Sequence, residues 1–175
     1  MKIIFLFDQT NKDLRIEIDK NEIIALSDFE LSWRWEKSHN SIISDFEKDQ
    51  IIPVSEMESK RLNKVIDFFE LEDDLSKKFI NHDWIRATSD HEDNIALFRK
   101  KITSILEPWT ENVLITWNRG TTLKTTKELF LKYWDDFCYP SSDDVTIISE
   151  ETNWVMFYNH VEMAKIWTLK NPGIT

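Results

Sequence analysis

Four residues near the C-terminal end carry side chains from which a catalytic or metal site could be built: His160, Glu162, Asp143 and Asp144. An imidazole beside carboxylates can bind a divalent metal ion or transfer protons in general acid–base catalysis. The sequence has no His-x-x-x-His or Cys-x-x-Cys pair, so the fold alone would have to assemble such a site. The simpler interpretation is a histidine at a strand end beside solvated acids. We favour it, and we expect no catalytic residue, no metal and no cofactor.

The single cysteine and the neighbouring serines do not fit a nucleophile. Cys138 follows Asp135 and Asp136 at the end of an expected helix, where the acidic neighbours raise the pKa of a thiol. We therefore expect Cys138 to be a small buried apolar side chain. Ser141 and Ser142 lack the flanking glycines of a nucleophile elbow and fit a turn. With 2 glycines, the chain also lacks a glycine-rich phosphate loop and a dinucleotide fingerprint.

An acidic segment is the more distinctive feature. The seventeen residues 135–151 contain six carboxylates and no lysine or arginine: Asp135, Asp136, Asp143, Asp144, Glu150 and Glu151. Like charges this close repel one another unless water or a cationic partner meets them. A solvated surface is the plain interpretation, and a docking patch for a basic protein is the specific one.

Tryptophan is abundant, with 8 copies, and most of them fit periodic apolar stripes that predict a core. Trp33 and Trp35 are the exception because they flank Arg34 at the spacing of a strand, which places both indoles on one face. Such a pair can bind sugars or act as a hot spot for a protein partner.

The charge balance narrows the choice of partner. There are 32 acids and 22 bases, for a net charge of −10, spread over both halves of the chain. Nucleic acids and anionic membrane surfaces would be repelled, whereas a basic protein would be attracted. No apolar run approaches the roughly 18 residues of a membrane helix, and the start lacks the pattern of a signal peptide. One cysteine excludes an intramolecular disulfide framework, so we expect a cytoplasmic protein.

Hydrophobic periodicity predicts a β-rich first part and a helical middle. Strands are expected at residues 3–7, 14–18, 22–26 and 31–35, and residues 37–50 as a loop or short helix. Helices are expected from a capping box at Ser55 and Glu58, over 75–80, and from Asp90 to Pro108.

The last third mixes both types of element. A strand is expected at 113–117, a helix after a capping box at Thr125 and Glu128, and a hairpin formed by 145–149 and 154–158. Residues 161–169 fit a final strand or helix. The order predicts an α+β fold, with an antiparallel sheet and the helical middle segment packed on one face. We expect one domain over residues 1–170 and a frayed tail over 171–175.

The block from Trp134 to Val145, preceded by 125–130 and followed by Trp154 to His160, resembles the C-terminal block of small acidic bacterial proteins. These include uncharacterised families and immunity proteins of secreted toxin systems. The resemblance covers residues 112–160 and brings no catalytic residue. It implies a cytoplasmic inhibitor that binds a cognate toxin tightly and has no turnover of its own.

These observations lead to one favoured function and two alternatives. The favoured function is an immunity-type protein whose six carboxylates attract a basic toxin domain, which Trp33 and Trp35 then anchor. One alternative is a metal-dependent or acid–base enzyme that uses His160, Glu162, Asp143 and Asp144. The other is a carbohydrate-binding module that uses exposed tryptophans. The oligomeric state stays open.

Overall fold

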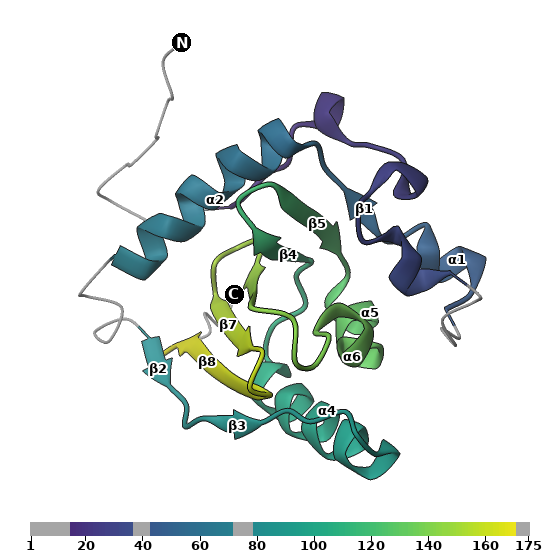
Figure 1. Cartoon of the computed structure of the whole chain (residues 1–175). Helices are drawn as coiled ribbons and strands as arrows, with labels where there is room; N and C mark the ends of the chain where they lie inside the picture. The colour runs from purple at the N-terminus through teal and green to yellow at the C-terminus, as the bar shows by residue number, and fades with distance from the viewer. Residues whose placement is uncertain (1–14, 37–42, 72–78, 171–175) are drawn as a thin grey trace.

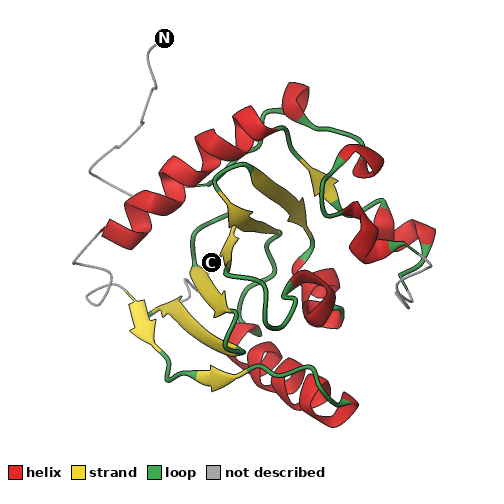
Figure 2. Cartoon of the chain, in the orientation of Figure 1, coloured by secondary structure: helices red, strands yellow, loops and turns green. Residues whose placement is uncertain are grey.

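The computed structural model describes residues 15–36, 43–71 and 79–170, and the side chains of all of these except residues 65–71. Within these ranges a single antiparallel sheet organises the fold (Figures 1 and 2). The strand order is β1-β5-β4-β6-β7-β8-β2, and β3 also pairs with β8. The strands are β1 (Ile52–Pro53), β2 (Phe79–Asn81), β3 (Ile85–Arg86), β4 (Val113–Asn118), β5 (Thr121–Thr125), β6 (Val145–Ser149), β7 (Trp154–Asn159) and β8 (Met163–Leu169).

The helices of the described ranges flank this sheet. They are α1 (Asp45–Lys48), α2 (Glu56–Leu71), α4 (Glu92–Leu106), α5 (Lys127–Lys132) and α6 (Trp134–Phe137), with the 3-10 helices η1 (Lys20–Glu22), η2 (Leu26–Asp28) and η3 (Ser32–Trp35). Among the described helices, none has the length and apolar character needed to cross a membrane.

Apolar side chains alternate along the strands and form a core on each face of the sheet. Leu114 and Ile148 pack with Leu62 of α2 on one face. Their sequence neighbours Ile115 and Ile147 point the other way, into the larger core. The larger core holds apolar side chains of α4, α5 and α6: Phe98, Ile102, Leu106, Leu129, Phe130, Leu131, Trp134 and Phe137. The α+β class with an antiparallel sheet is therefore confirmed (Figure 1). The prediction that the helical middle packs on one face is corrected, because α2 lies on one face of the sheet and α4 on the other.

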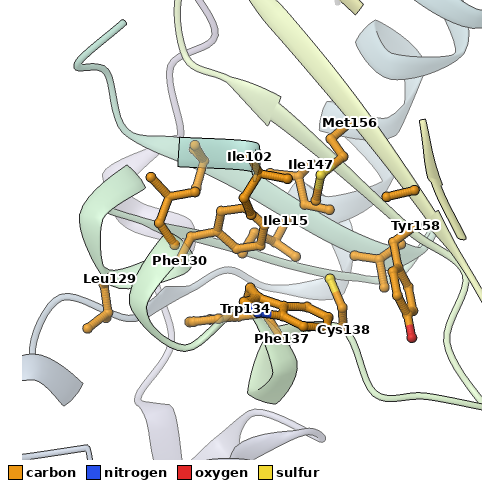
Figure 3. Packing of buried hydrophobic residues seen from close by; sticks show 14 of the residues in the cluster. Ile102, Ile115, Leu129, Phe130, Trp134, Phe137, Cys138, Ile147, Met156 and Tyr158 are labelled. Carbon is orange, nitrogen blue, oxygen red and sulfur yellow. The ribbon is translucent and has the colours of Figure 1, made fainter. Parts of the chain in front are cut away.

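Aromatic rings fill much of the larger core. Figure 3 shows Phe130, Trp134 and Phe137 of the α5–α6 segment against Ile115 of the sheet. The rings of Phe98 and Trp134 meet edge to face, with centroids 4.5 Å apart. Such edge-to-face pairs add to the stabilisation that apolar burial supplies.

Several predicted elements of the last third are confirmed, namely the strand at 113–117, the hairpin of β6 and β7, and a final strand within 161–169. The helix predicted from the cap at Thr125 and Glu128 needs correction. Thr125 pairs with Val113 in the sheet, and the hydroxyl of Thr126 caps α5 by accepting from the Leu129 N–H at 3.2 Å. Tyr133, with φ near −123°, then separates α5 from α6.

The predicted β-rich start is wrong where it is described. Residues 15–36 contain three 3-10 helices, and in this segment pairing with a strand is limited to the bridge between Ile23 and Val54. A local hydrogen bond explains the first of these helices, because the Asp19 carboxylate accepts from the Asn21 N–H at 2.9 Å. The predicted strand at 3–7 lies outside the described residues.

The predicted helices of the middle are partly confirmed. The Ser55 hydroxyl caps α2 by accepting from the Glu58 N–H, but the Glu58 carboxylate accepts from the Asp19 N–H and Arg61 instead of completing a capping box. The helix expected from Asp90 begins at Glu92. Residues 79–80 of the predicted helix 75–80 belong to β2, and the rest of that helix lies outside the described residues, as do both ends of the predicted domain.

A full capping box occurs instead in α1, where the sequence predicted a loop or short helix. The Ser44 N–H donates to the Glu47 carboxylate at 2.9 Å, and the Glu47 N–H donates back to the Ser44 hydroxyl at 3.3 Å. Lys132 and Tyr133 also donate to Glu47, and together these bonds lower its pKa to about 2. A four-residue helix is too short to be stable alone, so these contacts hold α1 in place.

Candidate functional site

A buried ion pair joins two segments that are far apart in the sequence. Arg34 of η3 donates two hydrogen bonds to Asp143, from Nη1 to Oδ2 at 2.6 Å and from Nη2 to Oδ1 at 3.0 Å. The side chains are only 4% and 8% exposed. This forked geometry is the strongest arrangement of an arginine on a carboxylate, so the pair fixes η3 against the turn that follows α6.

Asp143 receives further donors besides Arg34. The Tyr139 N–H donates to it at 2.8 Å, the Trp117 indole N–H at 3.2 Å and the Ser142 hydroxyl at 3.0 Å. Burial acts to raise the pKa of Asp143, but the hydrogen bonds from Arg34 and Tyr139 outweigh it and the pKa lies below its usual value. Asp143 is therefore ionised at neutral pH.

Three aromatic rings surround the Arg34 guanidinium. Its Cζ atom lies 5.3 Å from the ring centroid of Trp33, 5.5 Å from that of Trp117 and 5.4 Å from that of Tyr139. These distances are within the range of cation–π attraction. Trp33 also meets Tyr139 edge to face at 5.7 Å. The rings thus hold the guanidinium on the sides that Asp143 does not contact.

A surface hollow of about 220 Å³ opens over this pair, and we call it the acidic hollow. Its lining contains three carboxylates and one cation, which gives a local charge of −2. The lining residues are Glu30, Leu31, Arg34, Trp117, Asn118, Ser142, Asp143 and Asp144. A second hollow of about 390 Å³ shares Glu30 and Asn118 with it.

The carboxylates on the rim differ from Asp143 because water reaches them. Glu30 is exposed and accepts a hydrogen bond from the Thr121 hydroxyl, which carries no charge. Asp144 is 56% exposed and lies 2.9 Å from Nδ1 of His160. Hydrogen bonds from the His160 side chain and N–H lower the pKa of Asp144. Both rim carboxylates are available to a positively charged group from outside.

The predicted His160 cluster is assembled only in part. His160 and Asp144 are in contact, as the metal or acid–base alternative requires. Asp143 instead faces Arg34, and the turn at Glu162 donates from its N–H to the carbonyl of Asn159. Within the described ranges, no group of three His, Cys, Asp or Glu side chains is placed to hold a metal ion.

The six carboxylates of the acidic segment do not form one exposed patch, which corrects the prediction for the two that are buried. Asp143 is paired with Arg34, and Glu150, only 3% exposed, is paired with Lys124 and lies 3.7 Å from Arg15. The cations come from distant parts of the chain, so the absence of nearby lysine and arginine gave no sign of them. Asp144 and Glu151 are the exposed members.

Asp135 and Asp136 of α6 are half-buried. Burial raises the pKa of both, and for Asp136 burial together with the charge of Asp135 raises it to about 6. Two adjacent carboxylates in a partly dry setting are costly to ionise together. Because both side chains are half-buried, these residues present less of their negative charge at the surface than the sequence predicted.

The predicted tryptophan pair is also corrected. Trp33 and Trp35 lie on a 3-10 helix rather than a strand, so they do not share a face. Trp35 is 1% exposed and packs against Phe29 and Phe137, whereas Trp33 is half-buried beside Arg34. The pair does not form a sugar platform, and only Trp33 borders the acidic hollow through its contact with Arg34.

Cys138 is a buried apolar side chain, as predicted. It is 0% exposed, and burial raises the pKa of its thiol well above the usual value. Figure 3 shows it within the larger core, beside Tyr158.

Sequence reasoning missed Glu30 and the role of Arg34. The signal for Arg34 was its position between two tryptophans, whose rings can attract a guanidinium. Glu30 lies in an ordinary polar stretch and gave no signal.

No protein-family model, curated protein or solved structure matches the chain. The resemblance of residues 112–160 to immunity proteins therefore remains a prediction.

Proposed function

We propose that this protein is an immunity-type inhibitor that binds a basic partner, a toxin domain, through the acidic hollow. The observation that carries the proposal is the local charge of −2 in a hollow whose rim carboxylates, Glu30 and Asp144, are exposed. Lysine or arginine side chains of a partner fit this site because each would meet a carboxylate without displacing a stronger ion pair. In this proposal the protein acts by binding its partner and catalyses no reaction of its own.

The surroundings of the hollow support the same function. The net charge of −10 attracts a basic partner over a longer range, which speeds its association. Tyr139, 38% exposed, and the half-buried Trp33 lie beside the hollow, where aromatic contacts would slow dissociation. Arg34 and Asp143 act as positioning residues that hold these groups in place.

The test is to retain the tagged protein from cells of its source organism on a resin and to identify what remains bound at high salt. We expect a basic protein in stoichiometric amount, whose toxicity in a recipient cell is suppressed by co-expression of this chain. The double variant Glu30→Gln and Asp144→Asn should lose that protection. A matched control, Asp93→Asn in α4 with Glu107→Gln at its C-cap, changes the net charge equally and should keep the protection.

Two results would contradict the proposal. One is that the tagged protein on the resin retains no basic protein at high salt. The other is full protection by the variant of Glu30 and Asp144, which would place the binding surface elsewhere.

A further inference from the structure

A second unusual surface lies at the edge of the sheet where β8 pairs with β2 and β3. Trp84, in the link between β2 and β3, is 49% exposed, and Trp167 of β8 is partly exposed. The ammonium nitrogen of Lys165 lies 5.7 Å from the ring centroid of Trp84 and 6.0 Å from that of Trp167. Two indoles therefore share one lysine between them.

The register of the strands explains why polar and aromatic groups meet on this face. Along β8, Ala164, Ile166 and Thr168 are buried, while Met163, Lys165 and Trp167 alternate with them and remain partly exposed. Across the sheet, Asn81 lies opposite Trp167, Phe157 opposite Lys165, and Arg86 opposite Met163. We call the set of Asn81, Trp84, Arg86, Lys165 and Trp167 the tryptophan face.

The two charged residues of the tryptophan face, Arg86 and Lys165, are both cations, and the exposed Asp83 precedes Trp84 in the same link. Lys165 and Arg86 form no ion pair with any carboxylate in the described part of the chain, although acids outnumber bases 32 to 22. Arg86 is exposed and Lys165 partly so. Two cations that pair with no carboxylate of the described ranges, beside two indoles, form a surface complementary to an anionic ligand with an apolar side.

We propose that the tryptophan face binds a short acidic oligosaccharide containing uronic acid units. The C–H faces of its sugar rings pack on the indoles of Trp84 and Trp167, because these rings are apolar and polarisable. A sugar carboxylate pairs with Lys165 and Arg86. The exposed amide of Asn81 hydrogen-bonds to hydroxyl groups. Two aromatic surfaces around one ammonium suit adjacent sugar units better than the single base of a nucleotide.

This site is independent of the acidic hollow, and it does not depend on the proposed inhibitor function. The sequence predicted sugar binding by Trp33 and Trp35, whereas this proposal assigns sugar binding to Trp84 and Trp167.

Isothermal titration with a purified trimer of galacturonic acid tests the proposal. We expect binding with a Kd below about 1 mM for the wild type, and binding weaker by at least about tenfold for Lys165→Met and for Trp84→Ala. Matched changes on α4, Lys100→Met and Leu97→Ala, should leave the affinity unchanged. Unchanged urea midpoints for the Lys165 and Trp84 variants would separate lost binding from lost folding.

The methyl-esterified trimer and AMP serve as comparison ligands in the same titration. We expect the ester to bind at least about tenfold more weakly, because its carboxylates are neutral. Absence of binding by the wild type, equal binding by the Lys165 or Trp84 variant, equal binding of the ester, or tighter binding of AMP would each overturn the proposal.

Discussion

Two cations of this acidic protein, Arg34 and Lys165, lie against tryptophan rings, but they differ in what else surrounds them. Arg34 is 5% exposed and makes a forked ion pair with Asp143. Lys165 is partly exposed and meets no carboxylate in the described ranges. A charge that is taken out of water needs an ionic partner, whereas one that water still reaches does not.

The comparison separates a structural role from a binding role. The Arg34–Asp143 ion pair is formed within the protein and positions η3, so its loss should affect folding. The ammonium group of Lys165 can pair with an anionic ligand, so loss of this side chain should weaken ligand binding and leave folding intact. The predictions below test this difference, in order of decreasing effect.

Removal of the partner of the buried cation should cause the largest loss. Asp143→Ala leaves the Arg34 guanidinium buried and unpaired, and we expect the free energy of unfolding to fall by about 3–5 kcal/mol. Urea denaturation monitored by tryptophan fluorescence measures this change. A loss below about 1 kcal/mol would mean that water reaches Arg34 and that the comparison with Lys165 fails.

Replacing Arg34 by a side chain of the same charge but a different shape should lower the free energy of unfolding by a smaller amount. Arg34→Lys keeps the positive charge but cannot make the two parallel hydrogen bonds to Asp143, so we expect a loss of about 2 kcal/mol. The same denaturation experiment applies. If the lysine variant is as stable as the wild type, charge alone holds η3 and the forked geometry contributes little.

Asp136, close to the same ion pair, should make stability depend on pH. Its pKa is raised from 3.8 to about 6, so the protonated form is favoured in the folded state. Its stabilising contribution is complete below the usual pKa of aspartate and is lost as the pH rises through about 6.

Asp136→Asn removes this dependence. Because the site is only partly buried and solvent screens it, we expect the variant to be more stable by about 1 kcal/mol at neutral pH and unchanged below pH of about 4. Denaturation curves across the pH range check the sign, and a gain that is equal at both ends of the range would contradict it.

The smallest effect should follow removal of the exposed cation. Lys165→Met should change the free energy of unfolding by less than about 0.5 kcal/mol, because the side chain is partly exposed and breaks no ion pair among the described residues. A loss of about 2 kcal/mol or more would show that Lys165 stabilises the fold as Arg34 does.

The sequence predicted the fold well in segments whose hydrophobic pattern determines the type of secondary structure. The hairpin of β6 and β7 follows from two apolar runs separated by an acidic turn, and α4 follows from its apolar stripe and the end of that stripe before Pro108. Within the described residues, the segment 15–36 was mispredicted because Ile16 and Ile18 alternate as in a strand. They pack on the side of α2 without joining a ladder of hydrogen bonds.

The candidate sites were harder to predict because distant residues create them. Asp143 and Asp144 are adjacent in the sequence, yet one is buried on Arg34 and the other is exposed beside His160. Lys124 neutralises Glu150 from a neighbouring part of the sheet. The tryptophan face depends on the register of β2, β3 and β8, which local patterns do not specify.

The most direct test of the central claim is the salt dependence of the rate at which the captured basic partner binds this protein. Stopped-flow measurements should show a rate that falls at least about tenfold between about 0.05 M and 0.5 M salt. For the variant with Glu30→Gln and Asp144→Asn, the rate at low salt should be slower and the dependence shallower. A wild-type rate that is the same at both salt concentrations would contradict the claim that exposed carboxylates of the acidic hollow attract the partner.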